Sequence, residues 1–370
     1  MKTQHFKKLL FSAAMVALLA GRCKQPEPIP PKGDYDGGYF VLNEGQFMHD
    51  NASVSFLSED LQQVENDVYA NVNDNQTLGD IAQSMFVNGD KIYFLVNNSD
   101  RVVVAGRWDM KHKGIMNSYV KAPRYMVKVS DRYAVMSNWG EVFDNNWNDV
   151  EDDYLAWVDL ENDVVSDTLH VDLGPNQMVY QNSKLYVGIA GVSQSRNKVL
   201  VLDPVSKQTI TEISTGDRPK FLAKDSDGRI WVLSTGNAAW TGNETAGKLQ
   251  IIDPATDTAV KEFNFQTTQH PEYLAYNADN HKMYFILDGK VYAISFNDSA
   301  LPTTPVVDLS GDVTKPYGLY YHDGKLFVTD AVDYQTAGKT VVYDTQNYHK
   351  VAELNVGLLP NSVRFNRSDR

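Results

Sequence analysis

The sequence contains one cysteine, Cys23, so the chain cannot form a disulfide bond with itself. Long hydrophobic runs are also scarce. The run Leu9–Ala20 has only 12 residues, too few for a stable helix across a bilayer, and no other segment is hydrophobic enough to span one. Positive charge is in deficit as well, because the formal net charge is −13. A long-range field of this sign disfavours nucleic acid and anionic membrane surfaces as partners.

Signals for catalysis and metal binding are few. The eight histidines include no pair with metal-ligand spacing, and neither a zinc motif nor a Gly-x-Ser-x-Gly nucleophile motif occurs. The acidic segment 145–153 does not match the spacing of a helix–loop–helix calcium site, which favours a solvated acidic loop. The sequence therefore predicts no catalytic residue, no metal site and no cofactor.

Residues 1–22 have the pattern of a secretory signal peptide, with lysines at positions 2, 7 and 8 before the apolar run. The cysteine that follows resembles the lipobox of bacterial lipoproteins, in which the thiol is acylated, so we expect lipidation at Cys23. Residues 23–36 contain four prolines and read as a stiff, extended tether. The alternative is an ordinary secreted protein with an incidental cysteine.

Six copies of one pattern run through most of the chain. Each has a proline, a hydrophobic strand rich in aromatics, a polar turn and a second hydrophobic run, and a degenerate seventh copy begins near Ala82. From Ala82 onward the anchors lie 41, 52, 44, 52, 45 and 44 residues apart, at Pro123, Pro175, Pro219, Pro271, Pro316 and Pro360. Such a period of short strands is typical of a β-propeller. With no long helical period present, the sequence predicts one all-β, seven-bladed propeller over residues 37–366.

The two ends of this region complement each other. After Pro360 only one strand remains, over 361–365, whereas the N-terminal part offers strands at 38–43, 52–57 and 64–69 without an innermost strand. Pairing the C-terminal strand with the N-terminal strands completes a seventh blade and removes the open edges of the ring.

In a propeller, the loops between the second and third strands emerge on the face where the innermost strands begin. Four of these loops are long, at 43–51, 137–153, 234–247 and 330–338, and they carry aromatic rings among amides and hydroxyls. Such loops suit a large, flat or amphipathic ligand, although the rings could instead pack the loops onto the rim.

The residues that follow the anchor prolines are expected to form a ring at the channel mouth, where they contact a ligand or hydrate the channel: Arg124, Asn176, Lys220, Glu272, Tyr317 and Asn361. From this ring, the loops and the strand starts we take as candidate ligand-binding residues Asn43, Glu44, Phe47, Arg124, Trp139, Trp147, Asn176, Arg218, Trp240, Tyr317, Tyr334 and Asn361.

Three segments, Gly38–Phe47, Ser53–Leu57 and Gly216–Leu233, resemble the exported YncE-like propellers of Bacteroidetes surface lipoproteins. The resemblance covers essentially residues 37–366. The BtuG-type branch of that group captures cobalamin and related corrinoids and hands them to an outer-membrane TonB-dependent transporter. The resemblance thus implies a lipid-anchored outer-membrane protein, at the cell surface or on the periplasmic face, with a corrinoid and that transporter as partners.

Three functions remain open at this stage. The first is capture and transfer of a corrinoid without chemistry, and the second is capture of another nutrient, such as a glycan or peptide. The third is a calcium-dependent propeller lactonase or lyase that uses loop carboxylates such as Glu44 or Glu141. Ligand-binding and activity measurements separate the three.

Overall fold

The computed structural model describes residues 30–368, and contacts within the chain define one unit over Pro31–Ser368. The predicted signal peptide, Cys23 and the first part of the tether lie outside the described residues. Among residues 30–368, no helix is both long enough and apolar enough to cross a membrane.

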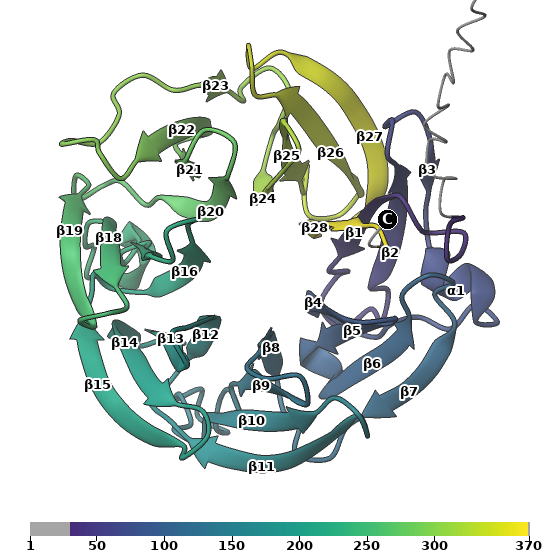
Figure 1. Cartoon of the computed structure of the whole chain (residues 1–370), viewed down its shortest axis with the longest axis horizontal. Coiled ribbons are helices and arrows are strands. Elements are labelled where there is room, and N and C mark those ends of the chain that lie inside the picture. Colours follow the sequence, from purple (N-terminus) through teal and green to yellow (C-terminus); the bar gives the residue numbers. More distant parts are fainter. Residues whose placement is uncertain (1–29, 369–370) are drawn as a thin grey trace, which may run out of the picture. The chain divides into compact units, whose positions relative to one another are not determined.

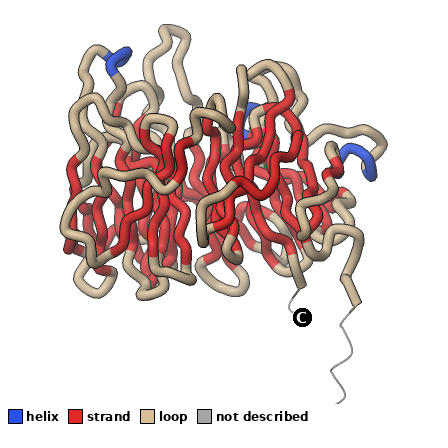
Figure 2. The backbone as a smooth tube through the Cα atoms, turned by 90° about the horizontal axis from the view of Figure 1, so that it is seen from above, coloured by secondary structure: helices blue, strands red, loops and turns tan. Residues whose placement is uncertain are grey.

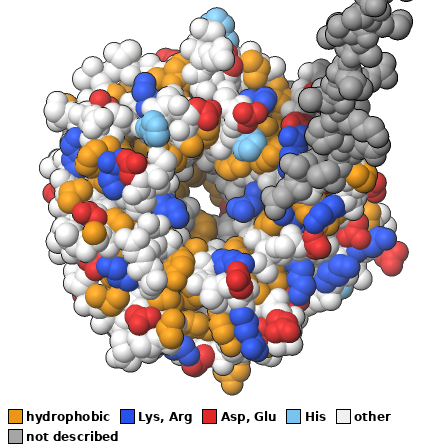
Figure 3. Space-filling view, in the orientation of Figure 1, with side chains coloured by type: hydrophobic (Ala, Val, Ile, Leu, Met, Phe, Trp, Pro, Cys, Tyr) orange, Lys and Arg blue, Asp and Glu red, His pale blue; other side chains and the backbone are white. Residues whose placement is uncertain are grey.

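The strands of this unit form seven four-stranded antiparallel sheets arranged as a ring, which confirms the seven-bladed propeller (Figure 1). The innermost strands pack against one another around the centre, and Figure 3 shows an opening there, with basic side chains beside it. The innermost strands are β4 (Ala82–Asn88), β8 (Pro123–Lys128), β12 (Pro175–Gln181), β16 (Pro219–Lys224), β20 (Glu272–Asn277), β24 (Pro316–His322) and β28 (Pro360–Asn366).

The two middle strands of each blade are hydrophobic and contribute most of the buried residues, because both of their faces pack against neighbouring blades. The second strands are β5 (Lys91–Val96), β9 (Tyr133–Asn138), β13 (Lys184–Gly191), β17 (Ile230–Ser234), β21 (Lys282–Leu287), β25 (Lys325–Asp330) and β1 (Gly38–Asn43). The third strands are β6 (Arg101–Gly106), β10 (Tyr154–Asp159), β14 (Ser195–Asp203), β18 (Lys248–Asp253), β22 (Lys290–Ser295), β26 (Ala337–Asp344) and β2 (Ser53–Ser58).

The outermost strands alternate between exposed and partly buried residues, as expected for an edge with one wet face. They are β7 (His112–Met116), β11 (Val164–His170), β15 (Gln208–Ser214), β19 (Thr258–Asn264), β23 (Val307–Asp308), β27 (Lys350–Leu358) and β3 (Val64–Glu65). Three short helices complete the described elements: α1 (Val68–Val72), η1 (Asn97–Ser99) and η2 (Ala239–Thr241).

The seventh blade is assembled from both ends of the chain, as predicted. Its strand order is β28-β1-β2-β3, and Val363 of the last strand lies opposite Val41 of the first. The prediction of a strand over 64–69 is wrong beyond Glu65. Asp67 adopts a left-handed backbone conformation, with φ of 59°, and helix α1 follows it. The helix buries Tyr69 against Phe94 of the first blade, so burial between blades outweighs the strand propensity of the segment.

Neighbouring blades are also joined by a repeated polar contact. The lysine that opens β13, Lys184, donates to Asp257 in the turn after β18, at 2.7 Å, and the Tyr186 hydroxyl donates to the same carboxylate. The first and second blades repeat the arrangement, where Lys91 and Tyr93 both contact Asp163 at 2.6 Å. The basic residue that begins these strands therefore has a structural use, which is to fasten one blade to the next.

Candidate functional site

The long loops lie on one side of the ring. Because neighbouring strands are antiparallel, the connections from second to third strands emerge where the innermost strands begin. Figure 2 shows that the loops on one side project further than those on the other. We call four of these connections the rim loops: 44–52, 139–153, 235–247 and 331–336.

The backbone changes direction sharply as it enters the innermost strands. In five blades the residue just before the strand has a left-handed backbone: Ile81 (φ 61°), Ala122 (43°), Gly174 (74°), Arg218 (56°) and Leu359 (52°). A register shift occurs within the first residues of all seven innermost strands. Bulges re-aim side chains, and here they act on the residues that follow the anchor prolines.

Glu44, Tyr317 and Asn361 meet at the channel mouth although they are far apart in sequence. Asn361 Nδ2 lies 3.4 Å from Glu44 Oε2, and the Tyr317 hydroxyl also bonds this carboxyl group. Burial raises the pKa of Glu44, while the bonds from Tyr317 and Asn361 and the charge of Arg124 oppose the rise. The Tyr317 ring meets Tyr334 of a rim loop edge-on, at 5.9 Å between centroids.

Arg124 lies beside this cluster. Its guanidinium carbon is 3.9 Å from the centre of the Trp139 ring, and the indole donates to the carbonyl of Pro175 at 3.0 Å. The Nε atom of Arg124 is buried and has no hydrogen-bond partner. Burial lowers the pKa of Arg124, whereas Tyr125, Glu44 and Tyr317 act in the opposite direction.

Lys220 and Glu272 add one charge of each sign to the same ring. Burial lowers the pKa of Lys220 and raises the pKa of Glu272, and each group partly offsets the shift of the other. Glu272 keeps solvent contact, as expected of a side chain that lines a channel. The charges of Arg218 and, to a smaller extent, Arg124 lower the pKa of Lys220 further, so both cations are within electrostatic reach of it.

The channel charges are not neutralised by direct pairs. Among residues 30–368, no ion pair within 4.0 Å involves any of four groups: Glu44, Arg124, Lys220 and Glu272. Charged groups that are partly desolvated and have no direct ionic partner are costly, and functional sites are where proteins retain them. This arrangement marks the channel mouth as the candidate binding site.

Four predicted aromatic residues lie exposed on the rim loops. The exposed fraction is 64% for Phe47, 80% for Trp147, 83% for Trp240 and 46% for Tyr334. The Gln46 side chain donates to the carbonyl of Tyr334 at 3.3 Å and so connects two rim loops. These rings are exposed on the face where the channel opens, whereas the Trp139 ring packs on Arg124.

Three other predicted residues are buried, and two of them use their polar groups within the protein. Asn43 is the last residue of β1, is fully buried and donates to Ser53 and Ser55. The guanidinium of Arg218 donates to Asn237 and to two carbonyls of residues 192 and 193. Asn176 is only 4% exposed. The structure thus brings Glu44, Arg124, Tyr317 and Asn361 together at the channel mouth. It buries Asn43, Arg218 and Asn176 within the blades.

Sequence reasoning put Lys220 and Glu272 in the ring but not among the ligand-binding residues, and it missed the channel tyrosines. Tyr273 has a left-handed backbone, with φ of 59°, and is within electrostatic reach of Tyr125, Tyr317 and Glu272. The Tyr125 hydroxyl accepts from Gln83 of the next blade at 3.3 Å. The sequence signal for these tyrosines is an aromatic residue two positions after the anchor proline. The same pattern is equally typical of a residue in the hydrophobic core.

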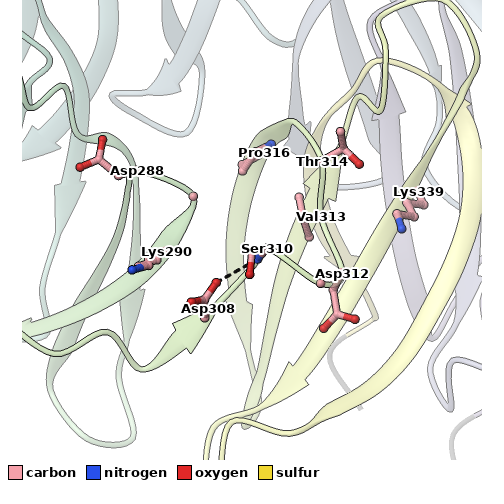
Figure 4. Close-up of a pocket in the computed structure, with 11 residues that line it drawn as sticks. Asp288, Lys290, Asp308, Ser310, Asp312, Val313, Thr314, Pro316 and Lys339 are labelled. Carbon is pink, nitrogen blue, oxygen red and sulfur yellow. Dashed lines mark hydrogen bonds between the residues drawn. The ribbon is translucent and has the colours of Figure 1, made fainter.

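A separate cavity of about 640 Å³ lies between the fifth and sixth blades (Figure 4). Its charged lining includes Asp308 and Asp312, and Asp312 is already paired with Lys350 at 2.6 Å. No charged group of the channel ring lines it. Within the described part of the chain, no three His, Cys, Asp or Glu side chains are placed to hold a metal ion.

Comparison with known proteins adds the family. The model of one family, described as a domain of unknown function (DUF5074), matches residues 37–348. The chain belongs to the DUF5074 family. None of the curated proteins compared matches this chain.

Solved structures similar to this DUF5074 protein share its fold at low sequence identity. A quinonprotein alcohol dehydrogenase-like protein from Bacteroides thetaiotaomicron has a TM-score of 0.68 and 14% identity, covering 91% of this chain and 80% of its own. The periplasmic gluconolactonase of Pseudomonas aeruginosa has a TM-score of 0.66 and 12% sequence identity, and the match covers 89% of this chain and 99% of the gluconolactonase. A putative 6-phosphogluconolactonase from Bacteroides fragilis has a TM-score of 0.61 and 10% sequence identity, and the match covers 91% of this chain and 99% of that protein.

Proposed function

We propose that this DUF5074 protein is a lipid-anchored outer-membrane protein that captures a corrinoid at the rim loops and channel mouth. It then passes the corrinoid to an outer-membrane TonB-dependent transporter. One observation carries the proposal: exposed rings stand on separate rim loops, on the face where the channel opens, and the buried Nε atom of Arg124 at the channel mouth has no hydrogen-bond partner among residues 30–368. The resemblance to YncE-like surface lipoproteins supports the choice of ligand.

The chemistry of the rim suits such a ligand. A corrin is a broad ring edged with amide side chains, so it needs aromatic contact area and many hydrogen-bond partners. Trp147 and Trp240 supply the area, and asparagines, threonines and backbone groups of the rim loops supply partners. Arg218 and Asn237 fasten the base of one rim loop, so part of the site is ordered before binding and less entropy is lost.

The anchor and the tether complete the proposal. Acylation at Cys23 and a proline-rich spacer hold the propeller away from the membrane without a spanning helix. Replacing Cys23 with alanine is expected to release the protein from the membrane fraction, and protease added to intact cells tests surface display. Retention of the C23A protein in the membrane would contradict lipid anchoring.

Titration calorimetry of the mature protein with cyanocobalamin tests the capture. We expect saturable binding, retained corrinoid absorbance after gel filtration, and weaker binding when Trp147 and Trp240 are both changed to alanine. The matched control is V205A, which removes an exposed apolar side chain from a turn between β14 and β15, away from the rim loops. Absence of heat, thermal shift and retained absorbance with the wild-type protein would sink the corrinoid proposal, and a soluble-glycan screen then tests the second ligand class.

A second candidate function is lactone hydrolysis in the channel. The observation that favours it is the Glu44 carboxyl, whose pKa burial raises, next to Arg124 and the Tyr317 hydroxyl. A carboxyl with a raised pKa is suited to general acid–base work. Two of the solved propellers with this fold are described as gluconolactonases, one of them as putative. Turnover of gluconolactone that is lost in E44Q and retained in E141Q would favour this candidate over capture.

A further inference from the structure

We propose that Arg124 and Lys220 form an anion-binding subsite inside the channel mouth, which takes a carboxylate or phosphate group of the ligand. The inference rests on the proposed function only in placing the ligand at the channel mouth, and it names the chemistry that this part of the site recognises. The two cations occupy equivalent positions, immediately after the anchor prolines of β8 and β16.

The first argument is that neither cation has a direct ionic partner in the described part of the chain, although Glu272 acts electrostatically on Lys220 and Glu44 on Arg124. Lys220 and Arg124 are close enough for mutual repulsion, yet within residues 30–368 neither forms an ion pair. Like charges in a partly desolvated channel repel more strongly than in water, because the effective dielectric constant is lower. An anion placed between them replaces repulsion with two attractions.

The second argument is the state of the Arg124 side chain. The Trp139 ring covers one face of the guanidinium, which fixes its plane, and its Nε atom is buried without an acceptor. A guanidinium held flat with free N–H groups is the arrangement that binds carboxylate or phosphate oxygens in pairs. A buried donor without an acceptor is costly, so an anion that supplies the acceptor gains that energy on binding.

The third argument concerns the two carboxyl groups that face this pair. Glu44, from a rim loop, is engaged by Tyr317 and Asn361, and Glu272, at the start of β20, has no hydrogen-bond partner for its side chain among the described residues. Desolvation in the channel raises the pKa of both carboxyls, although Glu272 keeps solvent contact. Protonation of either carboxyl removes a negative charge that opposes a bound anion, so anion binding should strengthen as the pH falls.

The anionic group that this subsite binds has two sources, a phosphodiester within the ligand and a free anion, and the experiment separates them. Cobalamin carries a phosphodiester that cobinamide lacks, whereas inorganic phosphate is a free anion. Affinities of wild-type protein, R124Q and K220Q are measured by calorimetry with all three probes. The matched control is K224Q, which removes an exposed lysine from the other end of β16. R124K keeps the charge without the planar fork and should recover part of the loss.

The expected result is weaker binding in R124Q and K220Q by about tenfold or more, in line with the strength of charged hydrogen bonds, with K224Q unchanged. A loss confined to cobalamin assigns the anion to the phosphodiester, and a loss confined to phosphate assigns it to a free anion; either supports the subsite. Wild-type affinities for cobalamin and phosphate in both folded variants would overturn the inference and leave corrinoid capture standing. Phosphate binding without cobalamin binding would remove the proposed ligand and keep the subsite.

Discussion

The guanidinium carbon of Arg124 lies 3.9 Å from the centre of the Trp139 ring, so an innermost strand and a rim loop meet through one cation–π contact. Trp139 also donates to the carbonyl of Pro175, at the start of the next innermost strand. One tryptophan thus joins the second blade, the third blade and a channel cation. Ligand contact at the rim and charge in the channel are linked through this residue.

Changing Trp139 to alanine should weaken cobalamin binding by about fivefold to thirtyfold, because Arg124 loses a contact of about 1–2 kcal/mol that orients its guanidinium. Calorimetry measures the effect. W139F keeps an aromatic face and serves as the control, with a smaller loss expected. Equal affinity of W139A and wild type would show that Arg124 needs no such support.

The stability of the protein should fall as the pH rises from about 4 to 7, in part because of Asp153. This carboxyl is fully buried, one of its oxygens lacks a hydrogen-bond partner, and burial raises its pKa from 3.8 to about 7. In that window the unfolded chain has released the proton while the folded protein still holds it, so deprotonation favours unfolding. The cost at neutral pH is at most about 4 kcal/mol.

The D153N variant tests this account by denaturant unfolding across the pH range. Asparagine keeps an oxygen for the Gly174 N–H, which Asp153 accepts at 2.8 Å, and it does not ionise. We expect D153N to be more stable than wild type at pH 8 and to lose part of the decline between pH 4 and 7. The exposed carboxyl of Asp131 provides the control, since D131N should leave the slope unchanged. An unchanged slope in D153N would rule out Asp153 as its source.

Breaking one fastening between blades should destabilise the ring. In D257N the partly buried ammonium of Lys184 and the Tyr186 hydroxyl lose a charged acceptor, and we expect the free energy of unfolding to fall by about 1–3 kcal/mol. A double-mutant cycle with Y186F measures the coupling by chemical denaturation, and D288N, at an exposed turn, is the control. Additive effects of D257N and Y186F would mean that the two groups do not act together.

The glycine before the third innermost strand should not tolerate a side chain. Gly174 has φ of 74°, and an added Cβ would lie 2.5 Å from the backbone of Gly191, at the end of β13. G174A should therefore cost about 2 kcal/mol or more, through backbone strain and a clash that neither backbone can avoid. In G114A, on the outermost strand β7, the new Cβ meets nothing within 4 Å, so its stability should change little. Thermal unfolding compares the two, and a G174A protein as stable as G114A would contradict the argument.

The repeat made the ring predictable because its period, its prolines and its complementary ends are all visible as residue types. The helix after Asp67 was not predictable, because its residues favour a strand and its conformation is determined by burial against another blade. The position of Asn43 was misjudged for a related reason. A loop boundary in sequence does not show which polar residue ends the strand and turns inward.

The candidate site was predicted in part. The ring after the prolines follows from the repeat, so Arg124, Tyr317 and Asn361 could be placed on one face of the propeller, and Glu44 was placed there by its loop. Their mutual contacts depend on bulges and on residues with a left-handed backbone. Residue types such as Ile81 and Ala122 do not predict that conformation. Tyr273 is the clearest example, because a tyrosine with positive φ is uncommon and carries no sequence signature.

The closing strand β28 is the last element of the fold to leave the ribosome, and its partner β1 is the first. Until residues 360–366 are made, the edge of β1 and the flanks of β4 and β24 have no neighbour at the centre. A chain that lacks β28 therefore exposes unpaired strand edges that proteases and chaperones can engage, whereas pairing of β28 with β1 covers them. The ring therefore closes only in a chain that includes β28.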